Sequence, residues 1–563
     1  MDKSFKKKLQ ISLLIILILI VVFATINQPW QKCPLIKISK NETIKNVIIM
    51  VPDGCSNSLQ TLARWKKGEA LTLDSLLTGA VTTYMANSII TGSGAAVTAF
   101  ATGYKTTGGF LSVGPRAEDV LTIFKHPGPE MKYRPLATVL EGAKLKDKST
   151  GLVATSKISH ATPAGFACHV HDRDKYNAIT EQMIYENLDV ALGGGKQHLL
   201  PKSEGGKRTD GENLIKALLD KGYQFVENRE EMSKIKSGRL WGIFAENHMH
   251  ADINRKEFQS NQPSLAEMTE KAIELLSQDK DGFFLMVEGS QIDWAGHAND
   301  PIYMVTDFLA FDEAVKVALD FAKKDKNTLV LAFPDHNTGG LTIGNWTTDI
   351  PYNETQVEDL LVPLNKMKIT AGGITHNLKS DHSYENLSKE ISKWWGIDIS
   401  KEEYKEIKKL KREIARRNNK VDSLERAISK VISKNYTVIG WTTDNHTGTD
   451  VPLWAYGPNR PVGLYDNTDL AKITAEALGF DLEDINKELF VEVGKIYPDY
   501  ILDKSDTANP ILKINNFELP ISKNLLITDD KTYELDGIVV YAPLTEKVYI
   551  PEQAVNLIGK LKE

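Results

Sequence analysis

The chain has 563 residues, enough for one large domain with additions. Its composition, 42% hydrophobic and 25% charged, is that of a folded globular protein and excludes a disordered or low-complexity chain. A formal net charge of −6 excludes a global positive field, so we expect no nucleic-acid-specific site. Because Cys33, Cys55 and Cys168 form no CxxC pair, any zinc is expected on histidine and carboxylate ligands.

The first 34 residues predict a signal peptide or an N-terminal membrane anchor. Four lysines within the first eight residues precede a near-continuous apolar run over residues 11–26. This run is long for a signal-peptide core and short for a transmembrane helix, while Val22-Phe23-Ala24 could end as a cleavage site. Because the lysines stay in the cytoplasm, either interpretation places the remaining chain in the periplasm or outside the cell. A buried core helix is the alternative, and the four lysines disfavour it.

Residues 35–484 are predicted to form an α/β fold, a three-layer sandwich with a mostly parallel central sheet. Five short apolar runs are typical of buried parallel strands, the last one more weakly: residues 47–51, 151–154, 283–287, 329–333 and 437–441. Helical patterns lie between them. Ser264 and Glu267 form a capping box that opens a helix through about Ser277, and residues 303–324 predict another helix. Strands that alternate with helices favour a parallel sheet.

Two segments depart from this alternation. Residues 377–436 contain a highly charged helical stretch with a turn expected at Asn418-Asn419. We interpret it as a solvated helical hairpin inserted between strands, which could also wall the functional site or mediate dimerisation. Residues 485–563 carry strand-like runs at 539–541 and 547–550, separated by Pro543. They predict a small β-rich C-terminal appendix without chemistry of its own.

Side chains that commonly bind metals follow four of the five apolar runs. In chain order they are Asp53, Glu288, Asp293, His297, Asp335, His336 and His446. Because sites in open α/β sheets form at the carboxyl ends of strands, these residues should converge in space. Any one of them alone would more often be a loop or capping residue, but four coincidences favour a metal site. Aspartate, glutamate and histidine without cysteine suit zinc and magnesium.

A second pattern indicates an anion site. Residues 91–103 predict a tight turn and a helix of small residues that ends at Gly103. Ser93 would stand at the helix N-terminus, where free N–H groups and the helix dipole favour phosphate. An ordinary N-cap serine is the alternative, and this segment alone favours it. Further along, Thr162 offers a hydroxyl to a hard cation, and Arg173 follows in a charged run where arginine is usually solvent-facing.

In order along the chain, these motifs resemble the alkaline phosphatase family over roughly residues 44–480. Each motif is modestly specific, whereas the ordered set is very specific. The motifs are Val-Pro-Asp53-Gly, Ser93-Gly-Ala-Ala-Val-Thr-Ala, His160-Ala-Thr-Pro-Ala, Val-Glu288-Gly-Ser-Gln-Ile-Asp293-Trp-Ala-Gly-His297, Pro-Asp335-His336 and His446-Thr-Gly-Thr-Asp-Val-Pro.

The resemblance implies a metal-dependent phosphomonoesterase that acts on small-molecule phosphate monoesters through a phosphoserine at Ser93, and the N-terminal segment adds the expectation that it is exported. It implies two zinc ions and one magnesium ion, and Arg173 would bind two phosphate oxygens. The implied ligands are Asp293, His297 and His446 for the first zinc, Asp53, Asp335 and His336 for the second, and Asp53, Thr162 and Glu288 for magnesium. The family is often dimeric, which leaves a homodimer open, and the N-terminal segment leaves a membrane attachment open.

The chain departs from the bacterial archetype of the family at three positions. Gly92 stands where the archetype has an aspartate that orients the arginine, so we expect another group, such as Asp172, to hold Arg173, or a looser arginine. His160 and Trp294 also differ, beside the third metal, for which magnesium is retained as the expected ion.

Three other functions compete with this interpretation. A phosphodiesterase or a sulfatase of the same superfamily is the nearest. Ser93 with Thr162 and Glu288 favours the monoesterase over the diesterase, and the modification motif that a sulfatase needs does not stand at this position. A non-catalytic, membrane-tethered binder of metal or phosphate should have lost ligands that this chain keeps. His248 and His250 are assigned no role, because their loop cannot be placed from the sequence.

Overall fold

The computed structural model describes residues 44–116, 129–349, 352–417 and 423–562. Its centre is a ten-stranded sheet in which every neighbouring pair is parallel except those that β13 makes with β8 and β2. From edge to edge the strands are β14 (Gly463–Asp466), β2 (Leu77–Thr82), β13 (Val451–Tyr456), β8 (Thr328–Ala332), β1 (Asn46–Pro52), β7 (Phe283–Gly289), β3 (Ser149–Lys157), β4 (Val190–Gly194), β6 (Leu240–Ile243) and β5 (Gln224–Val226).

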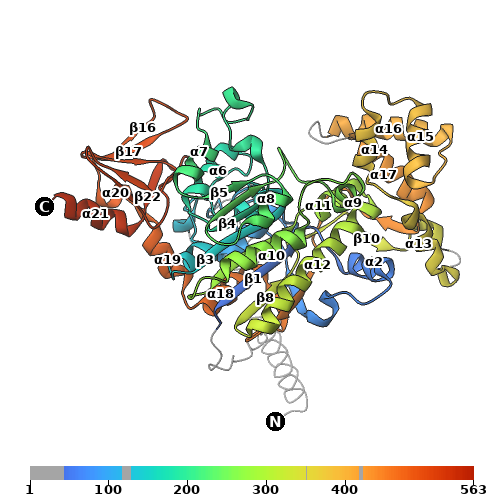
Figure 1. The fold of residues 1–563 in the computed structure, drawn as a ribbon, viewed down its shortest axis with the longest axis horizontal. Coiled ribbons are helices and arrows are strands. Elements are labelled where there is room, and N and C mark those ends of the chain that lie inside the picture. Colours follow the sequence, from blue (N-terminus) through green and yellow to red (C-terminus); the bar gives the residue numbers. More distant parts are fainter. Residues whose placement is uncertain (1–43, 117–128, 350–351, 418–422, 563) are drawn as a thin grey trace, which may run out of the picture.

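Helices cover both faces of this sheet, which confirms the predicted three-layer α/β sandwich (Figure 1). Along β1, Ile48 and Met50 pack into one apolar core, whereas Val47, Ile49 and Val51 pack into the other. The first core is closed by α2 (Asn57–Lys67), α10 (Leu265–Leu276) and α12 (Pro301–Asp325); the second is closed by α3 (Ser93–Thr102), α4 (Val139–Lys144), α6 (Tyr176–Tyr185) and α18 (Asn467–Leu478). Burial on both faces explains why these strands read as continuous apolar runs.

Four of the five predicted strands are confirmed as β1, β3, β7 and β8, which are neighbours at the sheet centre. The predicted parallel strand at 437–441 is wrong. Only β11 (Ile439–Trp441) forms there, and it pairs antiparallel with β10 (Leu341–Ile343) outside the central sheet. Of its three residues only Ile439 is fully buried, so the segment lacks the apolar length of a central strand.

The helical insertion lies between β10 and β11, and its described residues include five α-helices. They are α13 (Val357–Lys366), α14 (Ala371–Leu378), α15 (Tyr384–Trp395), α16 (Lys401–Arg417) and α17 (Ser423–Tyr436). The charged pattern predicted that the insertion begins at residue 377, but its first α-helix begins earlier, at Val357. Its buried side, including Ile407 and Ile428, joins the core on the α12 face of the sheet. The turn expected at Asn418-Asn419 lies outside the described residues.

The C-terminal segment forms small β-sheets, as predicted. Strands β15 (Val491–Glu492), β22 (Lys547–Ile550) and β21 (Val540–Ala542) form one sheet, and a second contains β16 (Ile501–Asp503), β17 (Ile511–Ile514), β18 (Phe517–Pro520), β19 (Leu525–Ile527) and β20 (Thr532–Glu534). The helices α19 (Leu482–Leu489), α20 (Val493–Ile496) and α21 (Glu552–Lys562) complete it. This appendix and the helical insertion lie at opposite ends of the molecule (Figure 1).

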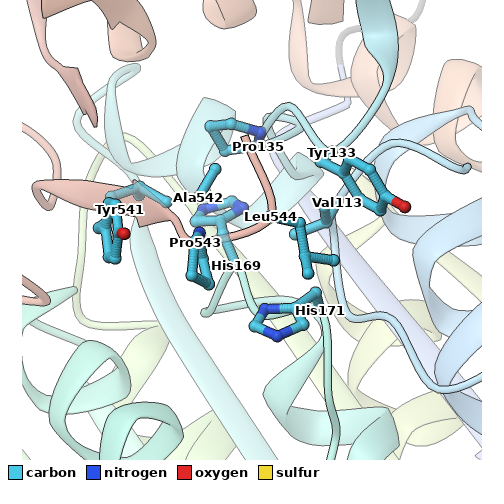
Figure 2. A pocket seen from close by; sticks show the side chains of 10 residues that line it. Val113, Tyr133, Pro135, His169, His171, Tyr541, Ala542, Pro543 and Leu544 are labelled. Carbon is cyan, nitrogen blue, oxygen red and sulfur yellow. The ribbon is translucent and has the colours of Figure 1, made fainter. Parts of the chain in front are cut away.

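The appendix packs firmly on the rest of the chain. Phe490 and Val540 share an apolar cluster with Ala137, and Lys523 pairs with Glu181 at 3.2 Å. Figure 2 shows the small pocket at this junction, where His169 and His171 lie beside Pro543 and Leu544. The pocket is lined by none of the predicted site residues.

The predicted signal peptide or anchor, residues 1–34, lies outside the described residues, as does Cys33. Among the residues that are described, no helix has the apolar length that a membrane span requires. Cys55 and Cys168 are buried free thiols.

Candidate active site

The predicted metal-binding residues gather at the carboxyl ends of the central strands. Asp53 follows β1, Glu288 lies in β7, and Asp335 with His336 follows β8. Asp293 and His297 lie on α11 (Gln291–Ala298), which begins just after β7. His446 arrives by another route than predicted: it lies in β12 (His446–Thr447), which pairs antiparallel with β9 (Asn337–Thr338).

Asp293, His297 and His446 form the first group, called cluster one. The two aspartate oxygens lie 3.4 Å from His297 Nε2 and 3.6 Å from His446 Nε2. The two Nε2 atoms are 3.3 Å apart. All three side chains thus offer a ligand atom within 4.8 Å of one another, a separation that suits one bound metal ion.

Asp53, Asp335 and His336 form the second group, called cluster two. His336 Nε2 lies 3.1 Å from Asp335 Oδ2 and 3.7 Å from Asp53 Oδ1, and all three side chains are fully buried. The rings of His336 and His446 stack with centroids 3.6 Å apart, so the two clusters are adjacent. The structure therefore offers two neighbouring three-ligand sites.

The outer nitrogen of each of these histidines has a polar partner. His297 Nδ1 lies 2.7 Å from the carbonyl oxygen of Asp444, and His446 Nδ1 lies 2.8 Å from that of Thr91. A carbonyl can only accept, so both Nδ1 atoms carry the proton and both Nε2 lone pairs face the cluster. This is the arrangement that orients histidine ligands toward a metal.

Thr338 connects the two clusters. Its hydroxyl donates to Asp293 Oδ1 at 2.5 Å and lies 3.2 Å from His336 Nδ1. Because the hydroxyl proton goes to the carboxylate, the oxygen accepts from His336 Nδ1. Sequence reasoning missed this residue, which lies two positions after His336 in the short strand β9.

A third group of oxygen atoms lies next to cluster two. Thr162 Oγ1, Glu288 Oε1 and both Asp53 carboxylate oxygens are buried and form no hydrogen bond with any described residue. Burial, reinforced by Asp335, Asp293 and Glu288, raises the pKa of Asp53 well above 3.8. Burial also raises the pKa of Asp335 to about 7. Such a concentration of dry carboxylates requires cations to be stable in the ionised form.

Ser93 stands at the N-terminus of α3, beside cluster two. Its Oγ lies 3.4 Å from His336 Nε2, and the side chain is buried. The helix is capped by Gly92, so the alternative of an N-cap serine is wrong, and Gly103 ends the helix as predicted. Free N–H groups of the first helical turn and the helix dipole therefore favour an anion at Ser93.

Arg173 is held by His160 in the structure. Its Nη2 lies 3.0 Å from His160 Nε2, and its backbone N–H donates to Gly109. Burial first, then the charge of Arg173, lowers the pKa of His160 well below 6.5, so the imidazole is neutral and accepts from the guanidinium. Asp172, the group suggested from the sequence, instead accepts a hydrogen bond from the backbone of Asp174.

His248, to which the sequence analysis gave no role, lies near this arginine. Its ring packs against Trp294 with centroids 4.2 Å apart and against His160 at 5.7 Å. Its Nδ1 accepts from the backbone N–H of Lys157. No local pattern could have revealed this contact, because it depends on how a distant loop folds back. The backbone of His250 is bound by Gln262.

Comparisons with known proteins agree with this geometry. The family model described as alkaline phosphatase matches residues 44–480. Alkaline phosphatase 3 of Bacillus subtilis is 36% identical over 469 residues, which cover 79% of this chain and 92% of that protein. The crystal structure of Thermus thermophilus alkaline phosphatase superposes with a TM-score of 0.68 at 29% identity, covering 79% of this chain and 93% of that one.

A further solved structure is a histidine-to-aspartate variant of TAB5 alkaline phosphatase with Mg bound in its M3 site. It matches with a TM-score of 0.54 and 25% identity, covering 78% of this chain and 99% of that chain. The similarity thus extends over the sheet, the helices and both clusters, but ends before the C-terminal appendix.

Proposed function

Because this chain belongs to the alkaline phosphatase family and is a phosphoric monoester hydrolase, we propose that it is an exported enzyme that works through a phosphoserine at Ser93. One observation carries the proposal. Ser93 Oγ stands at a helix N-terminus and 3.4 Å from His336 Nε2, at the edge of two adjacent three-ligand clusters. A nucleophile, an anion-binding helix end and cation sites thus meet at one place.

The residues present fit the metals that the family implies. Cluster one and cluster two each supply imidazole nitrogen and carboxylate oxygen, the ligands that zinc takes in catalytic sites. The unpaired oxygens of Asp53, Thr162 and Glu288 form an all-oxygen set that suits magnesium. The Mg held by the TAB5 variant supports this assignment. When bound, two zinc ions lower the pKa of a coordinated hydroxyl and neutralise charge on the attacking and leaving oxygens.

The chain's own residues define the reaction. Ser93 loses its hydroxyl proton to solvent, Oγ bonds to phosphorus, and the bond from phosphorus to the ester oxygen breaks; that oxygen takes up a proton from solvent, so that the alcohol leaves. Water then attacks the phosphoseryl group, inorganic phosphate departs, and Ser93 Oγ regains a proton. Arg173, fixed by His160, would bind two phosphate oxygens, and the α3 N-terminus favours the same negative charge.

Location and partners are inferred from the N-terminal sequence and the family. The lysines and apolar run within residues 1–34 support export, with this segment either removed or kept as a membrane anchor. We assign residues 35–484 to the catalytic domain and 485–563 to the appendix. The substrates are small-molecule phosphate monoesters, and a homodimer stays a prediction from the family.

An activity assay separates this proposal from the diesterase and from the non-catalytic binder. The purified full chain is given a monoester and a matched diester, with zinc and magnesium, at neutral and alkaline pH. We expect monoester hydrolysis that a chelator abolishes and that Ser93→Ala abolishes. Ser75→Ala, which removes an exposed hydroxyl, is the control and should leave turnover unchanged. Preference for the diester would replace the proposed substrate class, and no turnover despite bound zinc would favour the binder.

A further inference from the structure

The two carboxylate oxygens of Glu288 have different surroundings. Glu288 lies at the end of β7, where its partner in β1 is Val51, two residues before Asp53. Helix α5 (Ala161–Ala164), which carries Thr162, also contacts β7. The carboxylate is fully buried, and its Oε1 forms no hydrogen bond with any described residue. Oε1 is therefore the oxygen that Glu288 offers to the third group, whereas Oε2 is turned to two serine hydroxyls.

Ser290 is the serine that donates to Oε2. Its hydroxyl lies 2.5 Å from Glu288 Oε2, and its oxygen accepts from the backbone N–H of Ser156 at 3.1 Å. Because a backbone N–H can only donate, the proton of Ser290 is free for the carboxylate. Ser156 Oγ lies farther away, 3.4 Å from Oε2, and donates its single proton to the carbonyl of Lys157 at 3.0 Å. Ser290 thus supplies the hydroxyl proton that Oε2 receives.

Contacts with the end of β3 fix the position of Ser290. Its backbone N–H donates to Thr155 Oγ1 at 3.0 Å. The amide of the next side chain, Gln291, donates to the carbonyl of Thr155 at 3.3 Å and to that of Met249 at 2.6 Å. Ser290 itself is fully buried. Because both its backbone and its hydroxyl are bound, it holds the Glu288 carboxylate in one orientation.

We propose that Ser290 is a positioning residue for the magnesium site: by binding Oε2, it leaves Oε1 of Glu288 free and fixed for the ion. Without this hydroxyl, a buried carboxylate oxygen loses its donor and the carboxylate can rotate, which takes Oε1 out of the oxygen set. The inference rests on the magnesium assignment of the proposed function, and it adds a residue that is not itself a ligand.

Magnesium binding, measured directly, tests the inference. The full chain, loaded with zinc, is titrated with magnesium chloride in a calorimeter as wild type, Ser290→Ala and Ser290→Thr. We expect Ser290→Ala to raise the Kd for magnesium about 10- to 100-fold, the usual effect of removing a hydrogen bond to a metal ligand. Its zinc content should equal that of the wild type, because Glu288 belongs to neither zinc cluster. Ser290→Thr keeps the hydroxyl and should restore part of the affinity for magnesium.

Ser429→Ala is the control, because it also removes a buried serine hydroxyl, one that donates to the carbonyl of Glu425 within its own helix α17. Its Kd for magnesium should equal that of the wild type. An unchanged Kd in Ser290→Ala would overturn the inference, as would the loss of zinc together with magnesium, which indicates a structural role. A wild type that binds zinc but no magnesium would instead refute the magnesium assignment on which the inference rests.

Discussion

Replacing Thr338 by valine tests whether the two clusters depend on their shared hydroxyl. The change keeps the branched shape that a strand accepts and removes one oxygen. Two buried contacts are lost, the 2.5 Å bond to Asp293 Oδ1 and the 3.2 Å bond to His336 Nδ1. The first is made to a carboxylate, so its loss should cost about 1.5–3 kcal/mol. Because Thr338 supports ligands of both clusters, we expect Thr338→Val to bind zinc about 10- to 100-fold more weakly than the wild type.

The assay is a competition between the full chain and a zinc chelator of known affinity, for wild type and variant. Thr342→Val is the control, because Thr342 is exposed on β10 and contacts neither cluster. We expect Thr338→Val to release zinc at a much lower chelator concentration, whereas Thr342→Val matches the wild type. Equal zinc affinity in all three proteins would refute the reasoning that Thr338 positions both ligands.

Two further predictions concern backbone space and pH. Gly54→Ala should destabilise the fold by about 1–3 kcal/mol more than Gly68→Ala, as measured by urea unfolding. Both glycines have a φ near +75°, but a Cβ at Gly54 would lie 2.8 Å from Asp293 Cα, whereas nothing lies within 4 Å of a Cβ at Gly68. Equal losses in the free energy of unfolding for the two variants would show that only the positive φ matters. Burial lowers the pKa of His169, but the carboxylate of Glu141, 2.9 Å away, raises it by more, so that the pKa of His169 lies above 6.5. The pair of protonated His169 with Glu141 therefore stabilises the fold fully below pH 6.5, and this stabilisation is lost as the pH rises through the folded-state pKa of His169. His169→Gln should make the free energy of unfolding fall less steeply over that pH range. Equal slopes for wild type and variant would contradict this prediction.

Much of the fold could be predicted because its strands are buried on both faces. Such strands read as unbroken apolar runs, and parallel strands place the residues that follow them at one edge. Asp53, Glu288 and Asp335 could therefore be placed together without a structure. The capping box at Ser264 was equally visible, because it is a local pattern, and the structure confirms it.

The remaining features depend on contacts between distant segments. His446 follows β11, a three-residue strand outside the central sheet, and reaches cluster one through its pairing with Thr338. The contact of Arg173 with His160 joins two loops, and no periodicity encodes it. The helical insertion was recognised by its charged part, so its less charged beginning at Val357 was missed.

On the proposed route Ser93 carries phosphate during turnover, and acid quenching traps that phosphoserine for detection. The full chain is mixed with a ³²P-labelled monoester, quenched in acid, digested and analysed by mass spectrometry. We expect label on the peptide that contains Ser93, and none after Ser93→Ala. Rapid monoester hydrolysis with the label absent from Ser93, or found on another residue, would contradict it.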